Sequence, residues 1–200
     1  MIGIIDYGMG NLKSVSRALE FLEYPAQIVD SPDQLEKMSG LILPGVGSFP
    51  KAMENLIGSG FIPSLKREIS TGKPLLGICL GMQLLFQMGY EEEPVEGLGL
   101  LKGQVKRLTG DLKIPHMGWN RLICKKDHPL WEGLTDQPYL YFVHSFALDQ
   151  ITPDVIGTTI YGEELPVAVA RDNLMGVQFH PEKSGEDGLK ILRNFGEMIK

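Results

Sequence analysis

The sequence predicts an α/β protein in which a mostly parallel central sheet carries helices on both faces. Short apolar runs alternate with helical patterns through the first 90 residues, and this alternation is typical of βαβ units. Beyond Gly103, strand-like runs follow one another with only turns between them, which predicts a more antiparallel second half. No linker or low-complexity stretch divides the 200 residues, so a single domain over residues 1–200 is expected.

The elements of the first half follow from local patterns. "MIGIID" is a β-branched strand, and the next segment places Leu12, Val15 and Leu19 on one helical stripe. Ser31 is expected to cap a helix that has Pro32 at its first position. Further strands are expected at 26–29, at 40–49 with a Gly-rich loop at its end, and at 74–78. Further helices are expected at 31–38, 50–57, 62–70 and 80–88, the last one stopping at Gly89.

The second half is expected to contain six strands and a closing helix. The strand-like runs cover 104–109, 119–125, 139–146, 155–162, 165–172 and 174–180. In the last segment, Ser184 is the expected N-cap of a helix whose apolar stripe comprises Leu189, Leu192, Phe195 and Ile199. This stripe is typical of a helix that packs on a core.

Composition excludes several classes of protein. The net charge of −6 argues against a general nucleic-acid binder, because affinity for phosphate backbones needs clustered Lys and Arg. The chain has no signal-peptide pattern and no apolar run long enough for a membrane span, so a cytoplasmic location is expected. Cys79 and Cys124 are the two cysteines. They are expected to stay reduced, and Cys124 is interpreted as structural.

Two Gly-rich loops invite a nucleotide-binding interpretation, but neither completes the fingerprint. "GMGNLK" has Lys13 and "GVGSFP" has Pro50 where the third glycine of G-x-G-x-x-G belongs. A backbone N–H of "PGVG" could instead point at a developing oxyanion. The four histidines are far apart in sequence and form no metal-ligand spacing, so no catalytic metal is expected.

Cys79 lies between Gly77 and Gly81 where a strand pattern becomes a helix pattern. A cysteine in an apolar run is usually buried filling. The two glycines favour a sharp strand-to-helix turn that exposes the middle side chain as a nucleophile. At such a turn the helix N-terminus would favour the thiolate, and the Leu80 N–H could stabilise an oxyanion.

His180 and Glu182 supply the partner that a nucleophilic cysteine needs. In an extended segment residues i and i+2 face the same way, so the carboxylate can hold one imidazole nitrogen and leave the other to exchange a proton with a thiol. A surface His-Glu pair is the simpler alternative. Cys79 and His180 both lie at the expected carboxyl ends of strands, where sites form in such sheets, and together they predict a Cys-His-Glu acyl-transfer site.

These residues match a known family. "GICLGMQ" followed by "HPE" about a hundred residues later resembles the triad-type, class I glutamine amidotransferases. Within that family the chain looks like the glutaminase subunits of imidazole glycerol phosphate synthases, because of "DYGMGNLKS", "LPGVGSF", "PHMGWN", "YFVHSF" and "GVQFHPEKSG". The resemblance implies a three-layer, flavodoxin-like fold and a place in histidine biosynthesis.

The resemblance also implies roles for individual residues. Cys79 attacks the side-chain amide of glutamine, His180 gives a proton to the leaving ammonia, and Glu182 holds the imidazole. The oxyanion is stabilised by the backbone N–H groups of Leu80 and Val46. Glutamine itself is held by Gly47, Gln83 and the backbone around Ser145. No cofactor is expected.

The family passes the ammonia to a cyclase subunit, which makes imidazole glycerol phosphate and an aminoimidazole carboxamide ribotide. That subunit is a (β/α)₈ barrel, which needs about 250 residues of its own, so a heterodimer is expected. By resemblance, Asn11, Trp119 and Lys183 lie in loops that face the cyclase, although each could be ordinary surface.

Three alternatives remain open at this point. The chain could be the glutaminase of another pathway, such as pyridoxal phosphate synthesis. It could be a cysteine peptidase or small hydrolase that uses Cys79 and His180 on a similar fold. A non-enzymatic phosphate- or nucleotide-binding module built on "YGMGN" is the third possibility.

Overall fold

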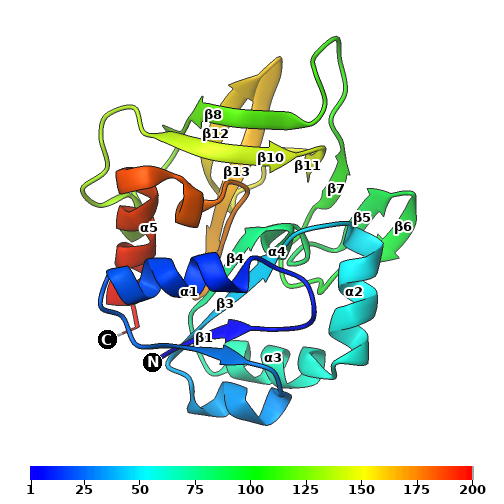
Figure 1. Ribbon diagram of the computed structural model, residues 1–200. Coiled ribbons are helices and arrows are strands. Elements are labelled where there is room, and N and C mark those ends of the chain that lie inside the picture. Colours follow the sequence, from blue (N-terminus) through cyan, green and yellow to red (C-terminus); the bar gives the residue numbers. More distant parts are fainter. Residues whose placement is uncertain (200) are drawn as a thin grey trace.

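The computed structural model describes residues 1–199 and builds them around an eight-stranded sheet (Figure 1). Across the sheet the strands follow the order β2 (Ala26–Val29), β1 (Ile2–Ile5), β3 (Gly40–Gly45), β4 (Leu75–Cys79), β14 (Leu174–Val177), β13 (Glu163–Arg171), β12 (Val155–Tyr161) and β9 (Ile123–Cys124). The first five strands are parallel to one another, and the remaining junctions are antiparallel.

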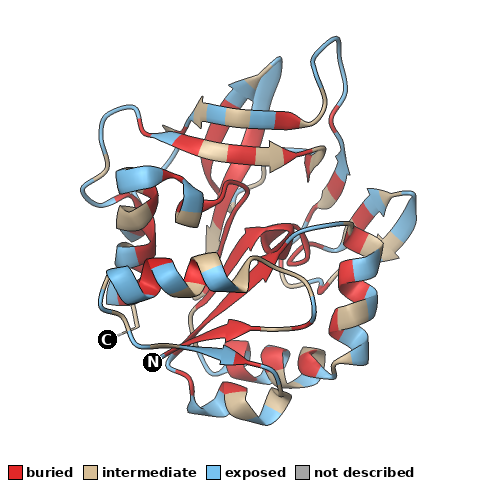
Figure 2. Ribbon diagram, viewed as in Figure 1, coloured by how far each residue is buried: buried red, intermediate tan, exposed pale blue. Residues whose placement is uncertain are grey.

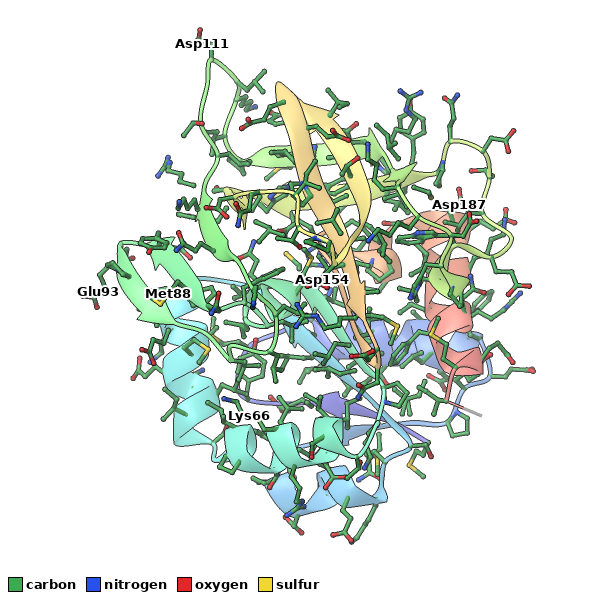
Figure 3. The ribbon with its side chains drawn as sticks, turned by 180° about the vertical axis from the view of Figure 1, so that it is seen from behind. Lys66, Met88, Glu93, Asp111, Asp154 and Asp187 are labelled. Carbon is green, nitrogen blue, oxygen red and sulfur yellow. The ribbon has the colours of Figure 1, made fainter. Side chains whose placement is uncertain are left out.

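Two smaller sheets lie beside the carboxyl ends of the parallel strands (Figure 1). One pairs β8 (His116–Arg121) with β10 (Tyr139–His144). The other has the order β11 (Phe146–Leu148), β7 (Gln104–Arg107), β5 (Met88–Glu91) and β6 (Glu93–Glu96). Figure 3 shows Met88 and Glu93 on the β5–β6 hairpin and Asp111 at the tip of the loop that joins β7 to β8. These sheets build a rim on one side of the central sheet.

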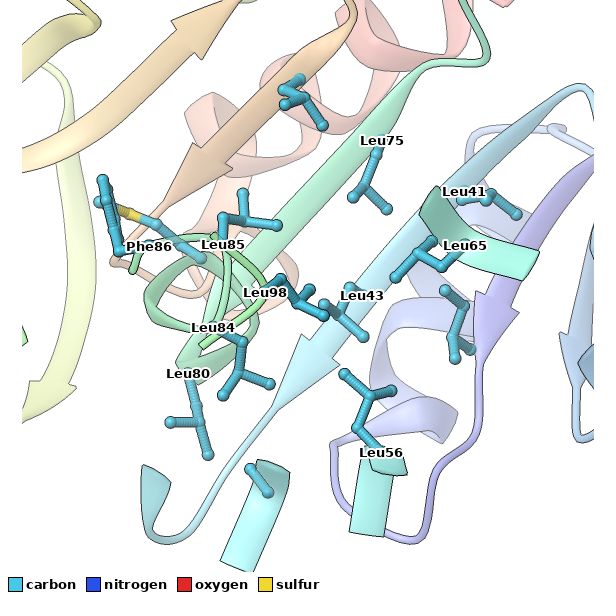
Figure 4. Close-up of a cluster of buried hydrophobic side chains, with 14 of the residues drawn as sticks. Leu41, Leu43, Leu56, Leu65, Leu75, Leu80, Leu84, Leu85, Phe86 and Leu98 are labelled. Atoms are coloured by element: carbon cyan, nitrogen blue, oxygen red, sulfur yellow. The ribbon is translucent and has the colours of Figure 1, made fainter. Parts of the chain in front are cut away.

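Helices cover both faces of the sheet and seal two cores. The core below β3 packs Leu41 and Leu43 against Leu56 and Leu65 (Figure 4), which come from α2 (Phe49–Gly58) and α3 (Phe61–Ser70). On the other face, Ile42 belongs to the core of α1 (Leu12–Phe21) and α5 (Gly185–Glu197). Because successive side chains of a strand point to opposite faces, a strand buried on both sides reads as a continuous apolar run (Figure 2).

The structure confirms the predicted α/β class, with a mixed, mostly parallel sheet between helices. The last helix occurs as expected, with Ser184 at its N-cap position. The Ser184 hydroxyl does not cap the helix, however; it donates to His180 O and accepts from Tyr141 N–H. The helix expected at 31–38 is the 3₁₀ helix η1 (Pro32–Lys37).

The helix predicted over 80–88 is wrong in length, since α4 covers only Leu80–Gln83. Two factors end it early. The carbonyls of residues 84–86, which a longer helix would use, accept hydrogen bonds from the amides of residues 98–101. The chain then enters β5, a strand that the apolar run concealed, because short apolar segments do not distinguish a helix from other buried structure.

Two predicted strands are each divided in the structure. The run at 119–125 becomes the end of β8 and the short strand β9, separated at the buried Leu122. The run at 139–146 becomes β10 and the start of β11, separated at Ser145. In both cases the chain leaves one sheet for another, which side-chain alternation alone does not report. None of the helices among residues 1–199 is long and apolar enough to cross a membrane.

Candidate active site

Cys79 is the last residue of β4 and turns the chain into α4. Its backbone has φ 55° and ψ −113°, a conformation that costs a non-glycine residue of order 1–3 kcal/mol. The turn requires both flanking glycines. A Cβ on Gly81 would lie 1.8 Å from Leu43 O, and one on Gly77 would lie 2.7 Å from Gly81 O. The strained turn aims the thiol into a cavity beyond the sheet edge.

The register of two neighbouring strands brings the distant halves of the site together. β14 is parallel to β4, and Val177 lies opposite Ile78. Cys79, at the end of β4, and residues 178–182, which follow β14, therefore lie at the same edge of the sheet. The backbone N–H of His180 donates to Tyr141 O over 2.9 Å, which ties this segment to β10.

The His180 imidazole is held at one nitrogen and free at the other. Nδ1 is 2.8 Å from Glu182 Oε1, and the two side chains are only 2% and 1% exposed. Nε2 is buried and makes no hydrogen bond among the described residues. This is the geometry expected of a base and its orienting carboxylate.

The environment of His180 shifts its proton equilibrium. Burial lowers its pKa, but interactions with the Cys79 sulfur and the Glu182 carboxylate raise it and prevail, so that the pKa lies at about 9. The imidazolium is therefore the main form at neutral pH. It places a positive charge beside the sulfur, an arrangement that suits a nucleophilic cysteine. This charge matters more than the helix N-terminus considered above, because α4 has only four residues.

A cavity of about 290 Å³ opens in front of the thiol. Eight residues were predicted to act on glutamine, and seven of them line this cavity: Val46, Gly47, Cys79, Leu80, Gln83, Ser145 and His180. The eighth, Glu182, stands behind His180. The cavity therefore collects residues from loops at the ends of β3, β4 and β14 and from the β10–β11 junction.

Gln83 is more fully engaged with the protein than its predicted substrate role suggests. Its Nε2 donates to Phe146 O and to Gln178 Oε1, each over 2.9 Å. Gln178 in turn directs its Nε2 toward the Cys79 sulfur at 3.6 Å. Since both amide hydrogens of Gln83 are used in this way, it positions the 145–146 segment and the wall behind the thiol.

Glu91 was not predicted, although it is the one carboxylate among the cavity-lining residues. It lies at the end of β5, and its Oε2 accepts a hydrogen bond of 2.7 Å from Phe49 N–H at the start of α2. In the sequence it opens an acidic run that looks like solvated surface. Only the position of β5, which the apolar pattern concealed, reveals it.

A buried histidine pair was also missed. His144 lines the cavity, donates from Nδ1 to Phe146 O over 2.9 Å, and accepts at Nε2 from His116 Nδ1 over 2.9 Å. His116 in turn accepts at Nε2 from Asn120. Burial lowers the pKa of both histidines to about 4, so both are neutral at pH 7, as this chain of donors and acceptors requires.

The three residues expected to face a partner lie outside the cavity. Trp119 is 56% exposed on β8, and Lys183 is exposed at the end of η3 (Pro181–Lys183). The Trp119 ring lies beside the segment that follows Lys183, since a Cβ on Gly185 would lie 3.9 Å from it. Asn11 is half-buried at the start of α1, a helix that contacts η3.

Comparisons with known proteins identify the family of the chain. The glutamine amidotransferase class-I family matches residues 3–198. The chain is 52% identical to the imidazole glycerol phosphate synthase subunit HisH of Caldanaerobacter subterraneus over 100% of this chain and 99% of the relative. It is 51% identical to the subunit of the same name from Desulfitobacterium hafniense, over 100% and 95% of the two chains.

Solved structures share the fold at lower identity. The structure of PurLQS from Thermotoga maritima has a TM-score of 0.81 at 21% identity and covers 100% of this chain and 98% of that one. A crystal structure described as a glutamine amidotransferase has a TM-score of 0.79 at 22% identity, with 99% and 98% covered. The chain belongs to the class-I glutamine amidotransferases, within the family of imidazole glycerol phosphate synthase HisH subunits.

Proposed function

We propose that this chain hydrolyses glutamine through a Cys79-His180-Glu182 triad and delivers the ammonia to a cyclase subunit of imidazole glycerol phosphate synthase. One observation carries the catalytic assignment. His180 lines the same cavity as Cys79, and its Nε2 makes no hydrogen bond among the described residues, while its Nδ1 is held by Glu182. This arrangement supplies a nucleophile, a proton donor and an orienting group within one site.

The first half-reaction forms a thioester. The Cys79 sulfur attacks the amide carbon of the glutamine side chain, and the carbonyl oxygen becomes an oxyanion near the N–H groups of Leu80 and Val46. When the oxyanion collapses, the carbon–nitrogen bond breaks. His180 gives its proton to the departing nitrogen, which leaves as ammonia.

The second half-reaction restores the enzyme. His180, now neutral, accepts a proton from a water molecule that attacks the thioester carbonyl. A second oxyanion forms at the same N–H groups and then collapses, breaking the carbon–sulfur bond. The sulfur departs as the thiolate beside the imidazolium, and the product is glutamate.

The cavity also suits the amino-acid end of glutamine. Glu91 offers a carboxylate for the α-ammonium group. Gly47 and Ser145 line the same cavity and bring backbone close to the substrate. These contacts favour a free amino acid over a peptide, whose α-amine would be an amide, and so argue against the peptidase alternative.

The partner proposal rests on exposed side chains and on the names of the relatives. Trp119 and Lys183 are exposed outside the cavity and present an aromatic ring and a cation, residue types that suit an interface anchor. Two similar chains are described as subunits of a synthase. A cyclase bound at this surface would complete the heterodimer.

The triad is tested by Cys79→Ser in the reconstituted complex with the cyclase. We expect glutamine-dependent product formation to fall below detection, because an alkoxide is much harder to form than a thiolate. Product formation from added ammonium salt should continue, since it bypasses the glutaminase site. Both rates are measured by following formation of imidazole glycerol phosphate.

Cys124→Ser is the matched control, because Cys124 is the second cysteine of the chain and lies exposed outside the cavity. It should keep both activities. If Cys79→Ser loses both activities or neither, the proposed assignment fails.

A further inference from the structure

Tyr7 lies in the "YGMGN" loop after β1 and contacts the segment that leads to Val46. It is only 4% exposed, and its hydroxyl donates a hydrogen bond of 2.9 Å to Pro44 O. Strand β1 pairs with β3 as far as Ile4, which lies opposite Ile42. The Tyr7 hydroxyl therefore reaches β3 beyond the point where β1 pairs with it.

The same hydroxyl stands where the nucleophile turn meets β3. A Cβ on Gly45 would lie 2.8 Å from Tyr7 Oη, 2.8 Å from Gly81 N and 2.9 Å from Leu80 Cβ. Gly45 pairs with Cys79 across β3 and β4. The Tyr7 hydroxyl, the backbone of Gly81 and the side chain of Leu80 thus all lie close to Gly45, the residue before Val46.

The rest of the loop packs in the same place. A Cβ on Gly10 would lie 3.0 Å from the Pro44 ring, and one on Gly47 would lie 2.6 Å from the Met9 methyl group. The "YGMGN" loop is thus packed against the "PGVG" loop. This contact argues against an open phosphate cradle at residues 7–11.

The hydroxyl remains a donor under working conditions. Burial raises the pKa of Tyr7 well above its usual range, and the charge of Cys79 adds to the shift. Tyr7 is therefore neutral wherever Cys79 is reactive. Its contribution is a fixed hydrogen bond rather than a transferred proton.

We propose that Tyr7 is a positioning residue for the oxyanion site: its hydrogen bond to Pro44 O fixes the Pro44–Gly45 peptide and so aims the N–H of Val46. The proposal rests on the proposed role of Cys79. Gly47, with φ 102°, and Gly45 have no side chain to restrain the segment. A contact from outside the loop is needed to hold the amide in place.

The test is Tyr7→Phe in a Cys124→Ser background, assayed with the cyclase present. The ring stays and only the donor is lost. We expect kcat for glutamine hydrolysis to fall between about 5-fold and 50-fold, less than the 10²–10³-fold cost of removing an oxyanion donor outright. KM for glutamine should change by less than about twofold, because the groups that bind the substrate are untouched.

A second measurement separates positioning from general damage. Alkylation of Cys79 by iodoacetamide needs the thiolate but forms no oxyanion, since the sulfur displaces iodide from a saturated carbon. Its rate should be unchanged in Tyr7→Phe, as should the melting temperature to within a few degrees. Tyr161→Phe is the control, because Tyr161 also donates to a backbone carbonyl, that of Lys113, and neither residue lines the cavity.

The outcomes are distinct. A slower kcat with normal alkylation and normal KM supports the proposal. An unchanged kcat overturns the proposal. A lower kcat also overturns it if the alkylation rate falls by the same factor, if KM rises, or if Tyr161→Phe lowers kcat equally. A complex that shows no glutaminase before any substitution would refute the proposed function itself.

Discussion

Cys79 combines a reactive side chain with a strained backbone. Its positive φ costs stability, and the surrounding backbone holds it, because Leu43 O lies against Gly81 and Gly81 O lies against Gly77. The charge on His180 is likewise a product of its neighbours, since burial alone would lower its pKa. The backbone conformation of Cys79 and the raised pKa of His180 therefore both depend on the residues around them.

Glu182→Gln should weaken both activity and a pH-dependent part of stability. The substitution keeps the shape and the Oε1 acceptor but removes the charge, so the pKa of His180 should fall below about 9 while the interaction with Cys79 still raises it. We expect kcat to fall roughly 10²-fold or more, because the imidazolium is less stabilised. Steady-state kinetics measures this loss.

The stability effect has a definite sign. His180 has a higher pKa folded than unfolded, so its stabilisation is complete below about pH 6.5 and is lost as pH rises through about 9. Urea unfolding between pH 6 and 10 should show a shallower decline for Glu182→Gln than for the wild type. Glu186→Gln, at an exposed pair with Lys190, is the control. Equal slopes in all three proteins would contradict the prediction.

The β4–α4 turn positions Cys79, and there is no space for a side chain at either of its two glycines. Gly81→Ala should destabilise the protein by about 3 kcal/mol or more, because the added Cβ would overlap Leu43 O and backbone must move. Gly58→Ala is the matched control at the end of α2, where nothing lies within 4 Å of the added atom.

In contrast to Gly81→Ala, Gly58→Ala should be neutral or raise stability by about 0.5 kcal/mol, since alanine restricts the unfolded chain. Urea titration of both variants gives the two free energies of unfolding. Similar values for the two substitutions would show that the turn can relax after all.

The elements also show where sequence patterns stop being informative. The grouping of Cys79, His180 and Glu182 could be predicted because the glycine spacing and the i, i+2 relation of His180 and Glu182 are local. Glu91 and the His116–His144 pair could not, because each depends on a strand pairing. His116 meets His144 through the register of β8 and β10, and Glu91 reaches the cavity only because α4 ends at Gln83. The helix α4 ends there because the carbonyls of residues 84–86 accept hydrogen bonds from the amides of residues 98–101.

For the whole molecule, the exposed side of the β8–β10 sheet is the surface that should bind the cyclase. Trp119→Ala should weaken the complex by about 2 kcal/mol, or roughly 30-fold in Kd, as expected for a central aromatic anchor. Isothermal titration calorimetry against the cyclase measures the affinity. Glutaminase activity measured at saturating cyclase should be affected less than binding.

Phe21→Ala provides the control for Trp119→Ala. Phe21 is 74% exposed on α1, so its removal deletes a comparable apolar surface outside the proposed interface. It should leave the Kd within about twofold. Equal weakening by both substitutions would mean that Trp119 contributes only general surface hydrophobicity.

The place of β14 in the sheet also bears on when the protein becomes active. β14 inserts between β4 and β13, and it leads directly to His180, a hundred residues after Cys79. During synthesis the nucleophile therefore emerges well before the strand that brings its base. A chain that lacks β14 and the residues after it would have the Cys79 thiol without its proposed base, so we expect hydrolysis of glutamine only once this segment has joined the sheet.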